Sequence, residues 1–173
     1  IPGKGRVSCQ FSKYFFELLK KNGVPTHYVE TIAENVMAVE PASLLGKKAK
    51  TDMAGAEDLY NLEWVFRNNA FGSFWRRHPF LTPCENLQKL IEVYAKGLPG
   101  QPDILMVDDS LVELGIVSQK EIFQTKRLLR EIAGVMEEEC KKRGLHLVDG
   151  KLEFGRNREN KIYRIDDISP DVI

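Results

Sequence analysis

Near the beginning of the chain, hydrophobic residues recur at the three- and four-residue spacing of a helix. They are Phe11, Tyr14, Phe15, Leu18 and Leu19, and this spacing places them on one face. Asn22 and Gly23 follow as a left-handed stop, and Pro25 prevents the helix from continuing. The pattern predicts one amphipathic helix, followed by two short strands at 26–32 and 35–39.

A second helix is predicted to begin after Ser118. Ser118 and Glu121 have the spacing of a capping box, in which a hydroxyl and a carboxylate each satisfy an otherwise unpaired backbone N–H. The expected buried face consists of Ile122, Leu129, Ile132, Ala133, Met136 and Cys140. The basic run Lys141–Arg143 suits the C-terminal end of the helix dipole, and Gly144 stops the helix.

Alternating hydrophobic and polar residues predict the strands of the rest of the chain. The expected strands are 61–66, 89–95, 145–154 and 161–165, the last two forming a hairpin. Segment 47–58 is polar and rich in small residues, which indicates a loop or a loosely formed helix and the best boundary between two lobes. The proline-containing segment 78–109 is predicted to be loop, apart from the strand inside it.

Composition narrows the classes of protein. The 173 residues include 25 Lys and Arg against 25 Asp and Glu, and 43% are hydrophobic, as in a globular protein. This balance argues against nucleic acid or an anionic membrane as the main partner. No apolar run is long enough to cross a membrane, and no secretory signal is expected. Three scattered cysteines indicate reduced thiols, so we expect a cytoplasmic protein.

The closing hairpin carries charged side chains in an ordered pattern. Strand alternation places Asp149, Lys151 and Glu153 on one face. The returning strand ends at Asp166, which can bring a second carboxylate beside Glu153. Adjacent carboxylates repel unless a cation or proton lies between them, and Mg²⁺ suits a few carboxylate oxygens combined with substrate phosphates. The alternative is a surface ladder of ion pairs centred on Lys151.

A second group of residues has the parts of an anion site. Arg67 supplies a guanidinium, Gly72 permits close approach to the backbone, and Ser73 supplies a hydroxyl. A helix beginning at Ser73 would add free N–H groups. The alternative is that Gly-Ser is a simple helix cap and that the arginines, Arg67, Arg76 and Arg77, form a solvated face.

At these residues the sequence resembles the SAICAR synthetase family of de novo purine biosynthesis. Segment Leu147–Gly155 reproduces the family's apolar-apolar-Asp-x-Lys-apolar-Glu-Phe-Gly signature at every position. Segment Glu63–Ser73 follows its Glu-x-apolar-apolar-Arg-x-x-x-x-Gly-Ser motif, and Asp166–Asp171 is similar to its Asp-Glu-x-Ser-Pro-Asp. Gly3–Gly5 and the first helix also fall in family order, so the resemblance spans essentially the whole chain.

The resemblance implies an α+β, two-lobed fold with antiparallel sheets and an ATP cleft between the lobes, of the ATP-grasp or kinase-like kind. Residues 1–58 would be the remnant of the N-terminal lobe, and 59–173 would be the second lobe, which carries the substrate and Mg-ATP residues. The implied activity is ATP-dependent ligation of carboxyaminoimidazole ribonucleotide to L-aspartate, which gives SAICAR, ADP and phosphate.

The resemblance also implies roles for individual residues. Catalysis is expected from Lys151 and Asp149, substrate binding from Arg67, Ser73, Lys96 and Asp171, ATP binding from Lys4, Glu63 and Lys151, and Mg²⁺ binding from Glu153 and Asp166. The partners implied are the small-molecule substrates, and self-association into a homo-oligomer stays open.

The sequence departs from the family at several points. Phe71 stands where the family prefers Ala or Thr, and Lys96–Pro99 replaces its Lys-Asn/Asp-Asp loop. The family's Gly-Lys-x-Lys-x-x-Tyr segment does not precede Ile1, and its usual Arg and Trp do not follow Asp171, so a central fragment is expected. Two alternatives stay open: a non-catalytic, nucleotide-binding relative or fragment, and an ATP-dependent ligase or kinase for another carboxylated nucleotide.

Overall fold

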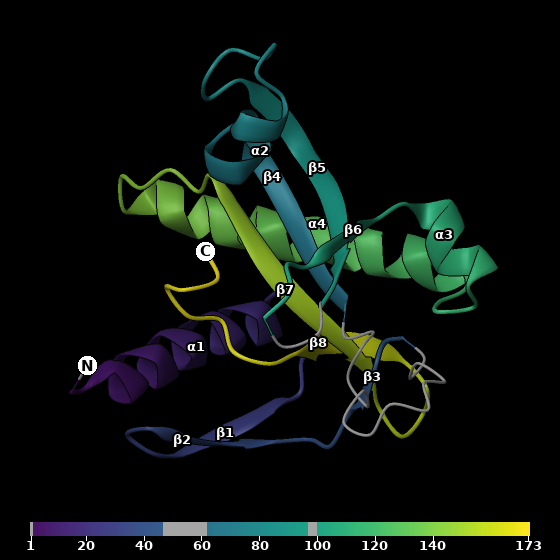
Figure 1. Cartoon of the computed structure of the whole chain (residues 1–173). Helices are drawn as coiled ribbons and strands as arrows, with labels where there is room; N and C mark the ends of the chain where they lie inside the picture. The colour runs from purple at the N-terminus through teal and green to yellow at the C-terminus, as the bar shows by residue number, and fades with distance from the viewer. Residues whose placement is uncertain (1, 47–61, 97–99) are drawn as a thin grey trace.

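The computed structural model describes residues 2–46, 62–96 and 100–173 (Figure 1). Its elements in chain order are α1 (Lys4–Lys21), β1 (Tyr28–Ala33), β2 (Val36–Val39), β3 (Ser43–Leu44), β4 (Leu62–Asn69), α2 (Gly72–Arg77), β5 (Asn86–Ala95), β6 (Ile104–Met106), α3 (Asp108–Glu113), α4 (Gln119–Lys142), β7 (Asp149–Arg156) and β8 (Ile162–Ile165). The fold is therefore α+β.

Two antiparallel sheets organise these elements. The larger sheet has the strand order β3-β7-β4-β5-β6, with β8 paired to β7, and β1 pairs with β2 as a separate ribbon. Helix α4 lies across one face of the larger sheet, and α1 packs against α4 (Figure 1). The opposite face of β4 and β7 carries the hollows of the site described below.

The two long helices match their predictions, with one difference in the buried face of α1. The capping box is present, since the Ser118 hydroxyl accepts from the Glu121 N–H and the Glu121 carboxylate accepts from the Ser118 N–H. In α1 the buried centre includes Phe16, which is 1% exposed, whereas Tyr14 is 41% exposed. The predicted stripe is otherwise confirmed, since Phe15 and Leu19 are buried and Phe11 and Leu18 pack against the core. Phe16 is added because the ring of Tyr28 on β1 stacks on it.

Several strand boundaries differ from the prediction. The closing hairpin begins at Asp149 rather than at 145, because the main chain just before it bonds to the end of β4: Val148 O accepts from the N–H groups of Asn68 and Asn69. Segment 78–109 is more regular than predicted, since it contains β5, β6 and the start of α3. Segment 47–58 and the proposed lobe boundary lie outside the described residues.

Close packing around β7 explains the two glycines of its signature. A Cβ at Gly155 would lie 2.7 Å from the Ser43 carbonyl oxygen on β3. A Cβ at Gly150 would lie 2.7 Å from the Phe66 ring on β4. Both glycines therefore permit neighbouring strands and side chains to approach β7, which fixes the position of the charged residues between them. Among the described helices, none is long and apolar enough to span a bilayer.

Candidate active site

The pairing of β4 with β7 brings two separate motifs onto one surface. Glu63 is the register partner of Glu153, and Arg67 is the register partner of Asp149. Lys151 lies on the same face of β7, between Asp149 and Glu153. The alternate residues Trp64, Phe66, Leu152 and Phe154 are almost fully buried on the other face, in the core. On both strands, alternation therefore places the core side chains on one face and the charged side chains on the other, as predicted for the hairpin.

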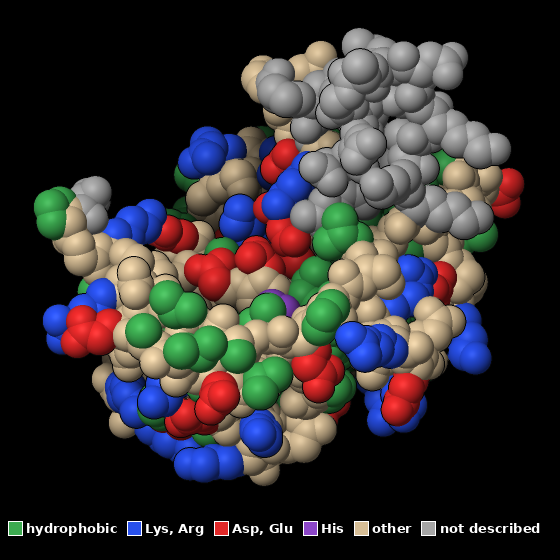
Figure 2. Space-filling model, turned by 90° about the horizontal axis from the view of Figure 1, so that it is seen from below, with side chains coloured by type: hydrophobic (Ala, Val, Ile, Leu, Met, Phe, Trp, Pro, Cys, Tyr) green, Lys and Arg blue, Asp and Glu red, His purple; other side chains and the backbone are tan. Residues whose placement is uncertain are grey.

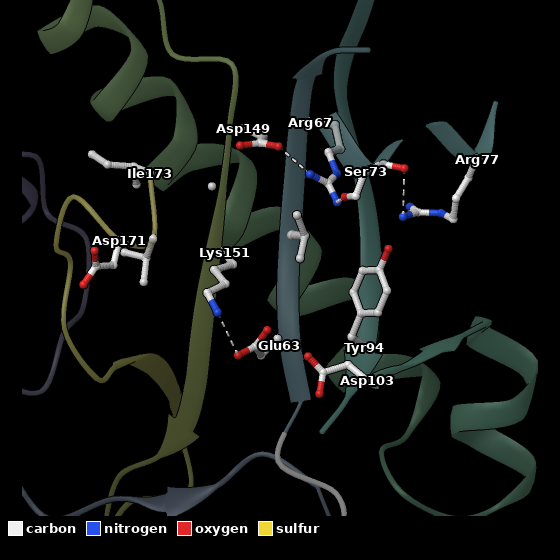
Figure 3. A pocket seen from close by; sticks show the side chains of 13 residues that line it. Glu63, Arg67, Ser73, Arg77, Tyr94, Asp103, Asp149, Lys151, Asp171 and Ile173 are labelled. Atoms are coloured by element: carbon white, nitrogen blue, oxygen red, sulfur yellow. Dashed lines mark hydrogen bonds and ion pairs between the residues drawn. The ribbon is translucent and has the colours of Figure 1, made fainter. Parts of the chain in front are cut away.

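The charged face opens into two adjoining hollows. The first is a cleft of about 420 Å³, lined by Glu63, Arg67, Ser73, Asp149, Lys151 and Asp171 among others (Figure 3). The second has a volume of about 240 Å³, and its lining includes Lys96, Glu153, Arg164, Asp166 and Asp167. Glu63, Lys151 and Asp171 line both. The structure thus gathers most of the predicted site residues into one continuous region.

Arg67 is the centre of the first hollow. Its side chain is 9% exposed, so the expected alternative of solvated arginines does not hold for this residue. Its Nε donates to Glu92 Oε2 at 3.1 Å, and its Nη1 donates to Asp149 Oδ2. Its Nη2 lies 3.5 Å from Ser73 Oγ. The guanidinium is thus held rigidly between three strands and directed toward α2.

The sequence assigned no role in the site to Arg77, which it named beside Arg67, and gave no sign of the carboxylate behind Arg67. Arg77 Nη2 donates to Glu92 Oε1 at 2.5 Å, and the Tyr94 hydroxyl donates to Glu92 Oε2 at 2.9 Å. Burial alone would raise the pKa of Glu92, but these hydrogen bonds and the charge of Arg67 hold it below its usual range. No local signal pointed to Glu92, although it lies on β5, the strand that Lys96 directly follows.

The second hollow contains the predicted pair of carboxylates. Burial, and then the negative charge of Glu153, raise the pKa of Asp166, as expected for two acids close together. Lys96 Nζ lies 2.6 Å from Glu153 Oε1 and 3.6 Å from Glu63 Oε1, and Lys151 Nζ lies 3.3 Å from the same Glu63 oxygen. Basic side chains therefore neutralise part of the acidic group, as in the ion-pair ladder considered above.

Acidic side chains also gather at the centre of the face seen from below, with basic side chains at their border (Figure 2). No group of three or more His, Cys, Asp or Glu side chains among the described residues is arranged to hold a metal on its own. A pair of carboxylates suits Mg²⁺ nonetheless, since this ion is usually bound by one or two carboxylates together with substrate phosphates and water. The donor set at Glu153 and Asp166 is therefore one that fits Mg²⁺.

The sequence did not specify the positions of three predicted residues, Ser73, Lys4 and Asp171. Ser73 is the second residue of α2, whose N-cap is Phe71, so it is not itself the cap. Lys4 begins α1 and lines neither hollow, and its Nζ lies 2.6 Å from Asp171 Oδ2. This exposed ion pair joins the beginning of the first helix to the segment that follows β8. Lys4 therefore reaches the site through Asp171.

Comparison with known proteins identifies the family of the chain. The family model for SAICAR synthetase matches residues 1–173. The chain belongs to the SAICAR synthetase family. It is similar to the phosphoribosylaminoimidazole-succinocarboxamide synthase of Clostridium tetani, with 36% identity over 172 residues. The match covers 98% of this chain and 70% of the relative. The chain is 35% identical over 170 residues to the synthase of the same name from a Nitratiruptor species, covering 98% of this chain and 64% of the relative.

Solved SAICAR synthetases share the fold of this family member. A SAICAR synthetase in complex with ADP aligns with a TM-score of 0.84 and 30% identity, over 99% of this chain and 66% of that one. The SAICAR synthetase of Pyrococcus horikoshii aligns with a TM-score of 0.83 and 30% identity, over 99% and 68%. The chain thus spans about two thirds of the length of the relatives it matches.

Proposed function

We propose that this chain carries the substrate and Mg-ATP residues of an enzyme that joins carboxyaminoimidazole ribonucleotide to L-aspartate. The observation that carries the proposal is the register of β4 and β7, which aligns Arg67 with Asp149 and Glu63 with Glu153 on one open face. Support also comes from the names of the C. tetani and Nitratiruptor relatives and from the ADP bound to a solved neighbour.

The hollow beside Glu153 would receive the phosphates of ATP. Glu153 and Asp166 would hold Mg²⁺, and Lys151, with Glu63 beside it, would line the same surface. Mg²⁺ in such a position offsets the negative charge of the phosphate oxygens. Lys4 would contribute from the rim, where it is paired with Asp171. Because Lys96 already contacts Glu153, nucleotide and metal would have to displace this lysine or share the carboxylate with it.

The cleft around Arg67 would receive the ribonucleotide. A phosphate dianion can take two parallel hydrogen bonds from a guanidinium, and the Ser73 hydroxyl lies beside Arg67 Nη2. Asp149 now occupies one edge of Arg67, so it would orient the arginine and the adjacent Lys151 toward the substrate. Lys96 and Asp171 would reach the substrate from the two sides of the shared region.

The reaction requires activation of a carboxylate, which is a poor electrophile. The substrate carboxylate attacks the γ-phosphorus of ATP, forming an acyl phosphate and releasing ADP. The amine of aspartate then attacks the acyl carbon, the C–O bond to phosphate breaks, and the amide, phosphate and a proton are released. Lys151 would stabilise the phosphate transferred, and the site must exclude water while the acyl phosphate exists.

The test is formation of ADP that depends on both substrates. The full chain should release ADP only when carboxyaminoimidazole ribonucleotide and aspartate are both present, and Glu153→Ala and Asp166→Ala should each lower kcat/KM by about a thousand-fold or more. Glu159→Ala is the matched control, because Glu159 is an exposed acid in the turn of the same hairpin. Equal loss in the control would contradict the assigned site.

Two other outcomes distinguish the alternatives. Thermal stabilisation by ADP and Mg²⁺ without turnover would show a protein that binds nucleotide and does not complete ligation. ATP use with a different carboxylated nucleotide, and none with the purine intermediate, would show a ligase or kinase of altered specificity. Phe71, which is 57% exposed beside α2, is the residue to exchange for Ala in that case.

A further inference from the structure

A buried arginine lies directly behind the two carboxylates proposed to bind metal. Arg164 belongs to β8, and the residue as a whole is 1% exposed. Its Nη1 donates to the main-chain oxygen of Glu153 at 3.1 Å, and its Nη2 donates to the main-chain oxygen of Asp167 at 2.5 Å. The side chain thus joins β7 to the turn after β8, the two segments that carry Glu153 and Asp166.

The hydrogen bonding of Arg164 is incomplete for so deeply buried a cation. Its Nε is buried without a hydrogen-bond partner among the described residues, and both terminal nitrogens donate to neutral carbonyl oxygens. A buried charge is costly unless nearby charges compensate it. Burial lowers the pKa of Arg164 to about 10, so the guanidinium still carries its positive charge at neutral pH.

The compensating charges are those of the proposed metal site. Asp166, Glu153 and Asp167 all favour the charged form of Arg164 electrostatically, and Arg164 lines the same hollow as these acids. The His27 main-chain N–H donates to the main-chain oxygen of Arg164, and the pKa of His27 is lowered to about 4 by burial and then by the charge of Arg164. His27 is therefore neutral near pH 7, and Arg164 is the fixed positive charge behind the acidic group.

The mobile cations of the hollow differ from Arg164 in one respect. The side chains of Lys96 and Lys151 are 40% and 46% exposed, so they can turn toward solvent or toward a phosphate when ligand binds. Arg164 is enclosed and clamped at two carbonyls, so its charge stays in place. Any divalent cation bound between Glu153 and Asp166 must therefore be bound in the presence of this charge.

We propose that Arg164 is a positioning residue that lowers the affinity of the Glu153–Asp166 site for a free divalent cation, so that the metal is bound together with nucleotide phosphates. The proposal rests on the proposed function, which assigns the metal to this pair. In the ligand-free protein, Arg164 offsets the repulsion between the two acids and bonds the main-chain oxygens of Glu153 and Asp167. When a phosphate ligand is present, its added negative charge offsets the arginine.

The test measures binding of Mn²⁺ alone, by electron paramagnetic resonance, to the full chain without nucleotide. Arg164→Gln removes the charge and keeps a donor for one carbonyl, whereas Arg164→Lys keeps the charge and a donor. We expect Arg164→Gln to bind Mn²⁺ about ten-fold more tightly than the wild type, and Arg164→Lys to bind it within about two-fold of the wild type. Arg158→Gln, an exposed arginine in the turn of the same hairpin, is the control for net charge and should change nothing.

A purely structural role predicts the opposite sign, since a loosened acid pair binds metal more weakly. Equal or weaker Mn²⁺ binding by Arg164→Gln therefore overturns the proposal. Arg164→Met provides a second neutral variant, and circular dichroism establishes folding in each case. If both neutral variants unfold while Arg164→Lys folds, the charge serves folding and the proposal is overturned. If wild type and Glu153→Gln bind Mn²⁺ equally even with ADP present, the metal site of the proposed function itself fails, which is a distinct result.

Discussion

The ammonium of Lys96 lies 2.6 Å from the Glu153 carboxylate, although β4 separates β5, which Lys96 follows, from β7, which carries Glu153. Lys96 follows the last residue of β5, and it reaches past Glu63 to contact β7. The acid that is proposed to bind metal is therefore paired with a movable cation in the ligand-free protein. Binding of Mg²⁺ with nucleotide should release this lysine toward the ligand.

Replacement of Lys96 should show separately its effect on metal affinity and its effect on ligation. In Lys96→Met, Mn²⁺ alone should bind several-fold more tightly because Glu153 loses its competing cation, while kcat/KM for ligation should fall by about ten-fold or more. Lys89→Met is the matched control, because Lys89 lies on β5, the strand that Lys96 follows, and pairs with Glu137 of α4 at 2.6 Å. Unchanged Mn²⁺ affinity in Lys96→Met would show that the ion pair does not compete with metal.

Removal of Arg67 should destabilise the protein as well as weaken substrate binding. Arg67→Met leaves the buried Glu92 with one fewer cation and Asp149 without its partner, and breaking such a buried pair should cost about 2–4 kcal/mol. Urea denaturation gives the change in unfolding free energy. Arg76→Met, in the exposed part of α2, should change it by less than about 0.5 kcal/mol. Similar losses in both variants would contradict a buried role for Arg67.

Two glycines should respond in opposite directions to alanine. Gly155→Ala places a Cβ 2.7 Å from the Ser43 carbonyl oxygen, which should separate β3 from β7 and cost about 1–3 kcal/mol. Gly134→Ala lies within α4, where a Cβ would meet nothing within 4 Å, so it should stabilise the protein by up to about 1 kcal/mol. Chemical denaturation gives the change in unfolding free energy of each variant. Changes of the same sign in both variants would refute the packing argument.

Acid should destabilise the protein through His27. Because the pKa of His27 is about 4 in the folded protein and ordinarily 6.5, the unfolded chain takes up a proton first as pH falls. The contribution is therefore complete above about pH 6.5 and is lost as pH approaches 4, with a size of roughly 1–3 kcal/mol. His27→Phe, which keeps a ring beside Phe16, should unfold with a shallower pH dependence.

The matched control for this prediction is an exposed histidine. His146 bonds to Asn69 at the protein surface, so His146→Phe should keep the acid dependence of the wild type. The measurement is thermal unfolding from pH 4 to pH 8. Parallel curves for His27→Phe and the wild type would mean that another group accounts for the acid sensitivity.

The sequence predicted those features that depend on residues a few positions apart. The capping box at Ser118 and Glu121 formed, and the common face of Lys151 and Glu153 followed from strand alternation alone. The resemblance also indicated correctly the family of the chain. Such signals are local or are written in a contiguous motif, so no knowledge of distant contacts was required.

Contacts between distant residues could not be derived in this way. Nothing near Glu92 in the sequence indicates that Arg67 and Arg77 converge on it, because both contacts depend on how β4, α2 and β5 are arranged. The burial of Arg164 was equally hidden, since an Ile-Tyr-Arg-Ile strand fits an exposed arginine as readily as an enclosed one. Its enclosure arises where β8 meets the main chain at Pro25 and His27.

By itself, the order of amino acids determined the two long helices, the alternation of β7 and the set of acidic and basic side chains available for chemistry. Only the tertiary structure decided which of those charges face one another: Arg67 with Asp149, Lys96 with Glu153, and Arg164 with the main chain behind both acids. The reason is physical. Propensity and capping act over a few residues, whereas electrostatic and hydrogen-bond partners are selected by strand register and burial across the whole sheet.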